Sequence, residues 1–182
     1  MDVVLASASP RRERLLKKIT RKFSVKTAKI DEKIGAGETF QKAAERLAVL
    51  KASAVADGKS VVIGADTIAY FGKRNFRKTK DGTTARRVLS YLRGKTHYVI
   101  TGVAVIYPSG RCVKYSVKAR VKMKEFTDDK LESYLKYGEW RGRAGCYDVS
   151  GKGRRLVASV RGEKETVVGL PLKRLKLILS TA

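Results

Sequence analysis

The segment SVVIGADTIAYF, residues 60–71, is the most apolar stretch of the chain, and it constrains the fold more than any other feature. Because apolar residues follow one another without alternation, the strand that it predicts must be covered on both faces. Strands of this kind are typical of α/β proteins, in which helices cover a central sheet. One carboxylate, Asp66, interrupts the run. Its burial is costly unless it is paired, binds a metal or lies at the exposed end of the strand. The alternative is an aspartate that caps the turn after the strand.

The rest of the chain alternates between helical and strand periodicity, which predicts an α/β class with a mixed sheet. The other predicted strands are residues 2–6, 23–30, 98–107 and 111–123, with the turn PSG making the last two a hairpin. The predicted helices begin at Pro10, Phe40, Thr84 and Asp128, and a short basic helix lies near the C-terminus. Residues 39–56 show helical spacing, with Gly58 as their stop signal. In 111–123, apolar residues alternate with basic ones, so one face is buried and the other is strongly basic.

The strongly positive net charge of the chain indicates which kinds of molecule it can attract. Forty-one Lys and Arg against 17 Asp and Glu give a formal net charge of +24, which attracts nucleotides, nucleic acid or an acidic membrane surface. The alternative is a general adaptation of the surface. Two cysteines make neither a disulfide framework nor a metal motif, and no signal peptide or membrane-spanning run is recognisable, so a cytoplasmic location without membrane contact is expected. The chain has a single Asn and a single Gln, a depletion typical of a thermophilic source.

The segment LASASPRRERLL, residues 5–16, places serines and arginines where an apolar run becomes a helix. Ser7, Ser9, Arg11 and Arg12 lie at a helix start, where unpaired backbone N–H groups favour an anion. Hydroxyls and guanidinium groups there predict a phosphate site. The alternative is a capped helix with two solvated arginines.

Other candidates are weaker alone. Asp31 and Glu32 follow the second predicted strand, and two carboxylates with phosphate oxygens suit Mg²⁺ or Mn²⁺. Lys51 lies near the end of its helix, where a structural role is the default. His97, the only histidine, and Trp140, the only tryptophan, are expected to be structural.

Taken in order, the segments SASPRR, IDE, RLAVLKA, GADT, LRGKTHYVITGVAV, YGEWRGRAGCYDVSGKG and VVGLPL resemble the Maf family of nucleotide pyrophosphatases. The resemblance covers essentially the whole chain, residues 1–182, as a single domain. It implies a two-lobed α/β fold similar to inosine-triphosphatase-like proteins, with a nucleotide cleft between the lobes. It also implies hydrolysis of nucleoside triphosphates to the monophosphate and pyrophosphate with a divalent cation.

The resemblance further implies roles for individual residues. Asp66 corresponds to the residue that accepts a proton from the attacking water, and Glu32 to the acidic residue that helps hold the metal with Asp66. Ser7, Arg12 and Lys51 correspond to positions of the phosphate site. Lys78 is the best match to a second lysine of that site.

Two positions depart from the family pattern. A proline is expected after Lys78, but Thr79 stands there, so Lys80 is an alternative. In the relatives that act on dTTP and UTP, specificity goes with positions that Arg11 and Thr67 match, and with a glutamine that Ser150 replaces. Serine lacks the paired amide donor and acceptor that reads a pyrimidine edge. The expected substrates are dTTP, UTP or modified pyrimidine nucleotides.

Two other classes of function remain open on the sequence. One is a nucleic-acid-binding protein that contacts phosphates with the basic strand residues 114–124 and the segment 73–80. The other is a regulator that binds nucleotide without hydrolysing it. A homodimer is common among proteins that look like this.

Overall fold

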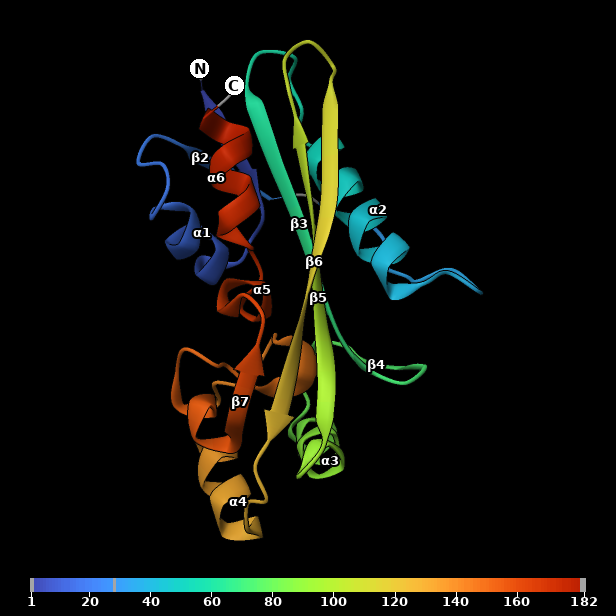
Figure 1. Cartoon of the computed structure of the whole chain (residues 1–182), viewed down its shortest axis with the longest axis vertical. Helices are drawn as coiled ribbons and strands as arrows, with labels where there is room; N and C mark the ends of the chain where they lie inside the picture. Colours follow the sequence, from blue (N-terminus) through green and yellow to red (C-terminus); the bar gives the residue numbers. More distant parts are fainter. Residues whose placement is uncertain (1, 28, 181–182) are drawn as a thin grey trace. The chain divides into compact units, whose positions relative to one another are not determined.

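The computed structural model describes residues 2–27 and 29–180 and confirms an α/β fold with a mixed sheet (Figure 1). The strands are β1 (Val3–Ala6), β2 (Ser24–Lys26), β3 (Val61–Phe71), β4 (Arg74–Phe76), β5 (Thr96–Ile106), β6 (Cys112–Met123) and β7 (Val157–Arg161). The helices are α1 (Pro10–Leu16), α2 (Phe40–Ser53), α3 (Gly82–Leu92), α4 (Asp128–Lys136), α5 (Lys164–Val168) and α6 (Leu172–Ser180). Two 3₁₀ helices are η1 (Ala144–Cys146) and η2 (Lys152–Leu156). Over the described residues the strand order is β2-β1-β3-β5-β6-β7, with β4 paired to β3.

The chain forms two compact units. Unit 1 holds the N-terminal part up to Thr67, the segment Ile100–Val117 and the C-terminal part from Gly169. Unit 2 holds Ile68–Val99 and Lys118–Val168. Strands β3, β5 and β6 each contribute residues to both units.

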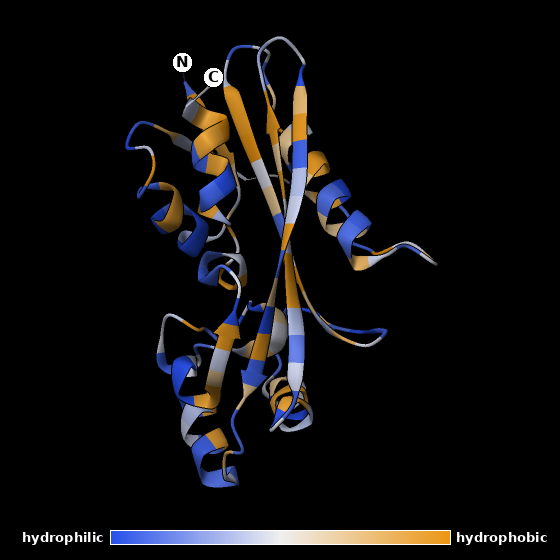
Figure 2. Cartoon of the chain, viewed as in Figure 1, coloured by the Kyte–Doolittle hydropathy of each residue, from blue (hydrophilic) through white to orange (hydrophobic). Residues whose placement is uncertain are grey.

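In unit 1, helix α2 packs closely on one face of the sheet. Its Ala48 and Ala52 are buried against Val4, Val62 and Ala104. Two glycines permit this approach, since a Cβ atom at Gly64 or Gly102 would lie 2.2 Å from a backbone oxygen of α2. Helices α1 and α6 lie on the side of these strands opposite α2 (Figure 1). The helices carry hydrophobic and hydrophilic residues along their length (Figure 2), as expected for helices that cover a sheet with one face.

In unit 2, the helix starts follow local capping chemistry. The carboxylate of Asp81 accepts hydrogen bonds from the backbone N–H groups of Thr83 and Thr84, so α3 begins two residues before the predicted start. Helix α4 begins as predicted, with Thr127 as N-cap. Trp140 is buried and donates its indole N–H to the Leu135 carbonyl, which confirms its structural role.

Strand β6 has the predicted two-sided character. One face is buried and consists of Tyr115, Ala119, Val121 and Met123. The lysines and the arginine of the other face are exposed, and Ser116 on the same face is half buried. The hairpin of β5 and β6 is likewise confirmed.

Two local predictions were wrong, and one strand was not predicted. The strand expected over 23–30 is only Ser24–Lys26, because its partner β1 ends at Ala6, which pairs with Lys26. Gly58 does not stop α2, which ends at Ser53; it lies in a turn in which Asp57 accepts hydrogen bonds from two backbone N–H groups. The basic segment 73–80 contains β4, a short strand that the sequence analysis did not predict.

His97 is fully buried in unit 2 and makes one side-chain hydrogen bond. Its Nε2 lies 2.8 Å from the hydroxyl of Tyr147, whereas its Nδ1 has no hydrogen-bond partner among the described residues. Burial lowers the pKa of His97 from 6.5 to about 4. The predicted structural role therefore fits a histidine that stays neutral in the folded protein.

This histidine makes stability depend on pH. Between pH 6.5 and about 4 the unfolded chain binds a proton that the folded chain does not, so the free energy of unfolding falls as the pH falls. The expected loss over this window is about 3 kcal/mol, measured by urea denaturation at several pH values. The control is His97→Phe, which is less stable at neutral pH because the Tyr147 hydroxyl loses its partner, but in which this slope disappears. An equal slope in both proteins would contradict the assignment.

Candidate active site

The candidate site lies in unit 1, beyond the carboxyl end of β1 and beside the middle of the parallel strand β3. The pairing of β1 with β3 ends with Ala6 opposite Gly64, and β3 continues to Asp66 and Thr67 without β1 beside it. The ends of parallel strands, where the chain turns away into helices, are the usual place for ligand sites in α/β sheets. Asp66 is inside β3 and 4% exposed, so the alternative of an aspartate capping the turn after the strand is wrong.

Asp66 is paired with a lysine of α2. Residues 62, 64 and 66 share the face of β3 that α2 covers, which brings Asp66 to Lys51 near the end of that helix. The Nζ atom of Lys51 lies 2.5 Å from Oδ1 of Asp66 and 2.6 Å from Oε1 of Glu32. Lys51 and Asp66 are both buried, whereas Glu32 is half exposed. One ammonium group thus holds two carboxylates that are 34 residues apart in sequence (66 − 32).

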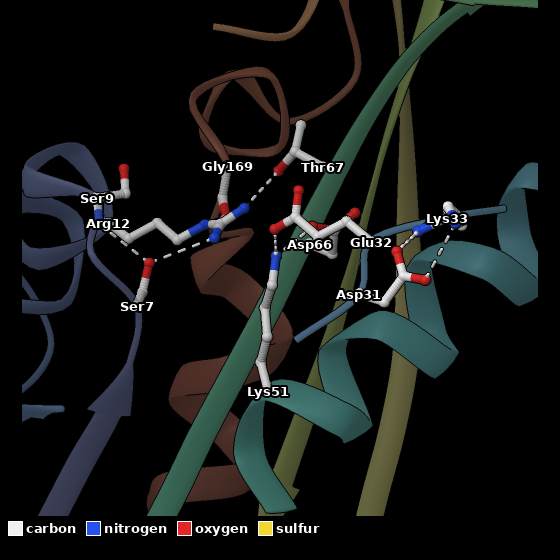
Figure 3. Close-up of polar contacts among 10 residues, drawn as sticks. All are labelled: Ser7, Ser9, Arg12, Asp31, Glu32, Lys33, Lys51, Asp66, Thr67 and Gly169. Atoms are coloured by element: carbon white, nitrogen blue, oxygen red, sulfur yellow. Dashed lines mark hydrogen bonds and ion pairs between the residues drawn. The ribbon is translucent and has the colours of Figure 1, made fainter. Parts of the chain in front are cut away.

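Asp31 does not join this cluster. It is exposed, accepts a hydrogen bond from the backbone N–H of Lys33, and points toward that residue in Figure 3. Of the two adjacent acids, the structure therefore brings Glu32 to the site.

Arg12 forms a second cluster beside the first. Its Nε donates to the Gly169 carbonyl at 2.8 Å, and its two Nη atoms donate to the hydroxyls of Ser7 at 3.3 Å and Thr67 at 3.0 Å. The Thr67 hydroxyl, which accepts from Arg12, lies 2.9 Å from the hydroxyl of Thr101. Arg12 and Lys51 both point toward Asp66 (Figure 3).

Arg12 is a buried cation without a carboxylate in direct contact. Within the described part of the chain, all three of its hydrogen-bond acceptors are neutral oxygens. Burial lowers the pKa of Arg12, and the nearby charges of Asp66 and Glu32 raise it in part. Such a cation is stabilised by an anion that enters the site.

The start of α1 contributes less than the sequence suggests. The helix has only seven residues, and Ser9, its N-cap, makes no capping hydrogen bond with its side chain. The Ser9 backbone N–H donates instead to the Ser7 hydroxyl. Arg11 is half buried and follows Pro10 on the same short helix. The positive charge of the site therefore comes from Arg12 and Lys51 more than from a helix dipole.

The carboxylates fit a divalent cation only in part. Among the described residues there is no group of three or more His, Cys, Asp or Glu side chains that could hold a metal. Glu32 and Asp66 both reach the same point, now contacted by Lys51, and carboxylate oxygens are the ligands that Mg²⁺ and Mn²⁺ prefer. Because Mg²⁺ is usually held by one or two carboxylates together with substrate phosphates and water, this pair suits such an ion.

The sequence is also similar to known proteins over its whole length. The profile of the family described as Maf-like protein matches residues 2–182. The chain belongs to the Maf-like family. A relative from Hyphomonas neptunium, named dTTP/UTP pyrophosphatase, is 41% identical over 178 residues, which cover 97% of this chain and 93% of the relative. A relative of the same name from Clostridioides difficile is 38% identical, with 96% and 92% covered.

Two solved structures of Ham1 proteins share the fold of this chain. A HAM1 protein from Coxiella burnetii aligns with a TM-score of 0.54 at 16% identity, and the alignment covers 100% of both chains. The Ham1 protein of Staphylococcus aureus aligns with a TM-score of 0.50 at 16% identity, over 69% of this chain and 73% of that one. The fold class expected from the Maf resemblance is thus confirmed.

Three of the residues expected from the Maf resemblance belong to unit 2, whereas the cluster described above belongs to unit 1. Lys78 and Lys80 are exposed residues after β4. Ser150 is exposed, and its backbone N–H donates to the carboxylate of Asp148, which also accepts from Arg143. The Glu139 carboxylate accepts the next backbone N–H groups, those of Lys152 and Gly153. The position of Ser150 is thus fixed by two acids of its own unit.

Two residues that contact the site, Gly169 and Thr101, were not identified as site residues from the sequence. Gly169 contributes a backbone carbonyl to Arg12 and has a φ of +120°. A Cβ atom there would lie 3.1 Å from the Thr67 hydroxyl and 3.3 Å from Arg12 Nε, so glycine permits the close approach. Gly169 lies in VVGLPL, a segment that contributed to the resemblance to the Maf family but to which the sequence analysis gave no functional role. Thr101 is a threonine in an apolar strand, and its contact with Thr67 requires the sheet pairing.

Proposed function

We propose that this protein hydrolyses nucleoside triphosphates to the monophosphate and pyrophosphate at the Arg12, Lys51, Glu32 and Asp66 cluster. The observation that carries the proposal is the meeting of two buried cations with two carboxylates where β1 ends beside β3. The names of the relatives, dTTP/UTP pyrophosphatase, support the same reaction.

The cations bind the triphosphate. Arg12 has no carboxylate partner in direct contact within the described chain, so its charge is available to phosphate oxygens, and the Ser7 hydroxyl beside it adds a further polar group. Lys51 supplies a second positive charge. Fixed positive groups of this kind stabilise the negative charge that develops on phosphoryl oxygens during transfer.

Asp66 accepts the proton of the attacking water. The water oxygen forms a bond to the α-phosphorus, and the bond from that phosphorus to the oxygen bridging to the β-phosphate breaks. The electron pair leaves with pyrophosphate, and the water proton passes to the carboxylate of Asp66. Lys51 holds this carboxylate in place through its 2.5 Å contact.

Glu32 and Asp66 are the residues that would hold Mg²⁺ or Mn²⁺. A bound divalent cation supplies further positive charge to the phosphoryl oxygens. The chain's own part is to present two carboxylates on one side of the phosphates and Arg12 on the other.

The proposed base preference is for pyrimidines: dTTP, UTP or modified pyrimidine nucleotides. Arg11 and Thr67 match the specificity positions, and Ser150 takes the place of the expected glutamine. In this chain the Thr67 hydroxyl is engaged with Arg12 and Thr101, which supports a role in positioning Arg12 as well.

Several finer points belong to the same proposal. Lys78, or Lys80 in its place, binds phosphate oxygens, and the chain works as one functional domain. We place the enzyme in the cytoplasm, where its substrates occur, and infer a homodimer and a thermophilic source. Within the described residues, no helix is long and apolar enough to cross a membrane.

The test is pyrophosphate release from canonical and modified nucleoside triphosphates, with Mg²⁺, with Mn²⁺ and with neither. We expect metal-dependent release that favours pyrimidine nucleotides. The matched variant Ser150→Gln is expected to raise the preference for dTTP and UTP about tenfold, since one paired hydrogen bond is worth about 1–2 kcal/mol. If no triphosphate is hydrolysed but nucleotide binds saturably, the protein is a nucleotide-binding regulator. If only nucleic acid binds, with steep salt dependence, the basic surface is the functional one.

A further inference from the structure

Unit 2 contains a cavity that the proposed reaction does not use. It measures about 360 Å³ and is lined by residues of the loop after β6, of helix α4 and of η2. This volume is within the range of small-molecule sites. None of the residues that line it belongs to the cluster in unit 1.

The lining is strongly positive. Four cations, Lys124, Lys130, Lys152 and Arg155, face one acid, Glu125. That acid is placed against the backbone of Gly94, where a Cβ atom would lie 1.8 Å from its Oε1. In the described part of the molecule, none of the four cations makes an ion pair. Unneutralised cations that converge on one cavity favour a multiply charged anion.

The cavity also has aromatic walls. Tyr137 is 49% exposed, which is unusual for a large aromatic residue, and the Nζ atom of Lys152 lies 3.3 Å from its ring centroid. Phe126 is buried, with the guanidinium of Arg93 over its ring. Tyr137 is therefore the aromatic ring that is open to a ligand, and an exposed aromatic ring next to cations can bind a base and its phosphate together.

We propose that this cavity is a second nucleotide site, and that its ligand is a nucleoside monophosphate. The base lies against Tyr137, and the phosphate is bound by Lys130, Lys152 and Arg155. A nucleoside monophosphate has a dianionic phosphate for the cations and a planar base for Tyr137. Inorganic phosphate would contact the cations only. The proposal rests on the cavity alone and does not require that the protein hydrolyse triphosphates.

The experiment is a titration of the ¹⁵N-labelled protein with UMP, inorganic phosphate and uridine in separate arms, followed by amide chemical shifts. We expect saturable shifts at Phe126, Lys130 and Tyr137, with UMP binding more tightly than phosphate or uridine. The amides of Ser7 and Arg12 report the other site in the same spectra. A failure of the proposed hydrolysis is read separately, from pyrophosphate release, so the two proposals are distinguished.

A charge-reversed double variant, Lys130→Glu with Arg155→Glu, is expected to weaken UMP binding at the cavity about tenfold or more. The control is Lys136→Glu, which reverses one charge on α4 outside the cavity lining and is expected to leave the affinity unchanged. Both variants alter exposed side chains, and unchanged shifts elsewhere verify the fold. The proposal is overturned if UMP moves only the amides near Ser7 and Arg12, or if phosphate binds the cavity as tightly as UMP.

Discussion

Replacing Asp66 by asparagine is expected to lower pyrophosphate release about a thousandfold or more, because general-base catalysis contributes roughly 10²–10⁴ and the metal site loses a carboxylate as well. Asparagine has nearly the same shape and keeps a side-chain oxygen that can accept the hydrogen bond from Lys51. It cannot take a proton from water. The measurement is kcat for the best substrate of the panel at saturating metal.

Two controls separate chemistry from stability. Asp31→Asn makes the same change at an exposed acid that contacts Lys33 rather than Lys51, and activity is expected to stay within about twofold, as for most surface substitutions. The melting temperature of Asp66→Asn reports whether the buried Lys51 tolerates the loss of one of its two partners. A variant that retains a tenth of the wild-type rate would show that another group accepts the proton.

The structure explains why Asp66 could be identified from the sequence. A charged residue inside a run of apolar residues is informative by itself, because burying it needs a compensating partner. The sequence pattern around Asp66 does not indicate which residue is that partner. Lys51 is 15 residues earlier on a helix, and it meets Asp66 only because small residues let α2 lie directly on β3. The Maf resemblance, rather than the periodicity, pointed to this lysine.

The helices and strands also divide into those that local sequence determines and those that depend on distant contacts. The long strands and the starts of α2 and α4 follow from residue periodicity and capping, which are local. The length of β2 depends on where its neighbour β1 ends, and the end of α2 on a turn around Asp57, so both predictions failed. Gly169 is the clearest case, since its role depends on a backbone carbonyl 157 residues away from Arg12 in sequence.

The second large effect is expected at Arg12. Replacing it by lysine keeps the positive charge but removes the planar guanidinium with its several N–H donors. A lysine ammonium cannot donate to the Gly169 carbonyl and to the hydroxyls of Ser7 and Thr67 in the same geometry. We expect kcat/KM to fall about a hundredfold, as two charge-assisted hydrogen bonds are worth roughly 3 kcal/mol. Arg14→Lys is the matched control, because Arg14 is an exposed arginine of the same helix, and it should leave kcat/KM unchanged.

Arg12→Met distinguishes a binding role from a structural one. Burial lowers the pKa of Arg12, which means that the folded protein holds this cation against a desolvation penalty. Methionine removes that penalty but leaves the Gly169 carbonyl without its donor, so the free energy of unfolding is expected to change by no more than about 2 kcal/mol. Activity, in contrast, should be lost. Pyrophosphate should raise the melting temperature of the wild type and not that of Arg12→Met, since ligand that binds only the folded state stabilises it. If Arg12→Met fails to fold, Arg12 is primarily a structural link between α1, β3 and Gly169, and the phosphate site must be centred on Lys51 instead.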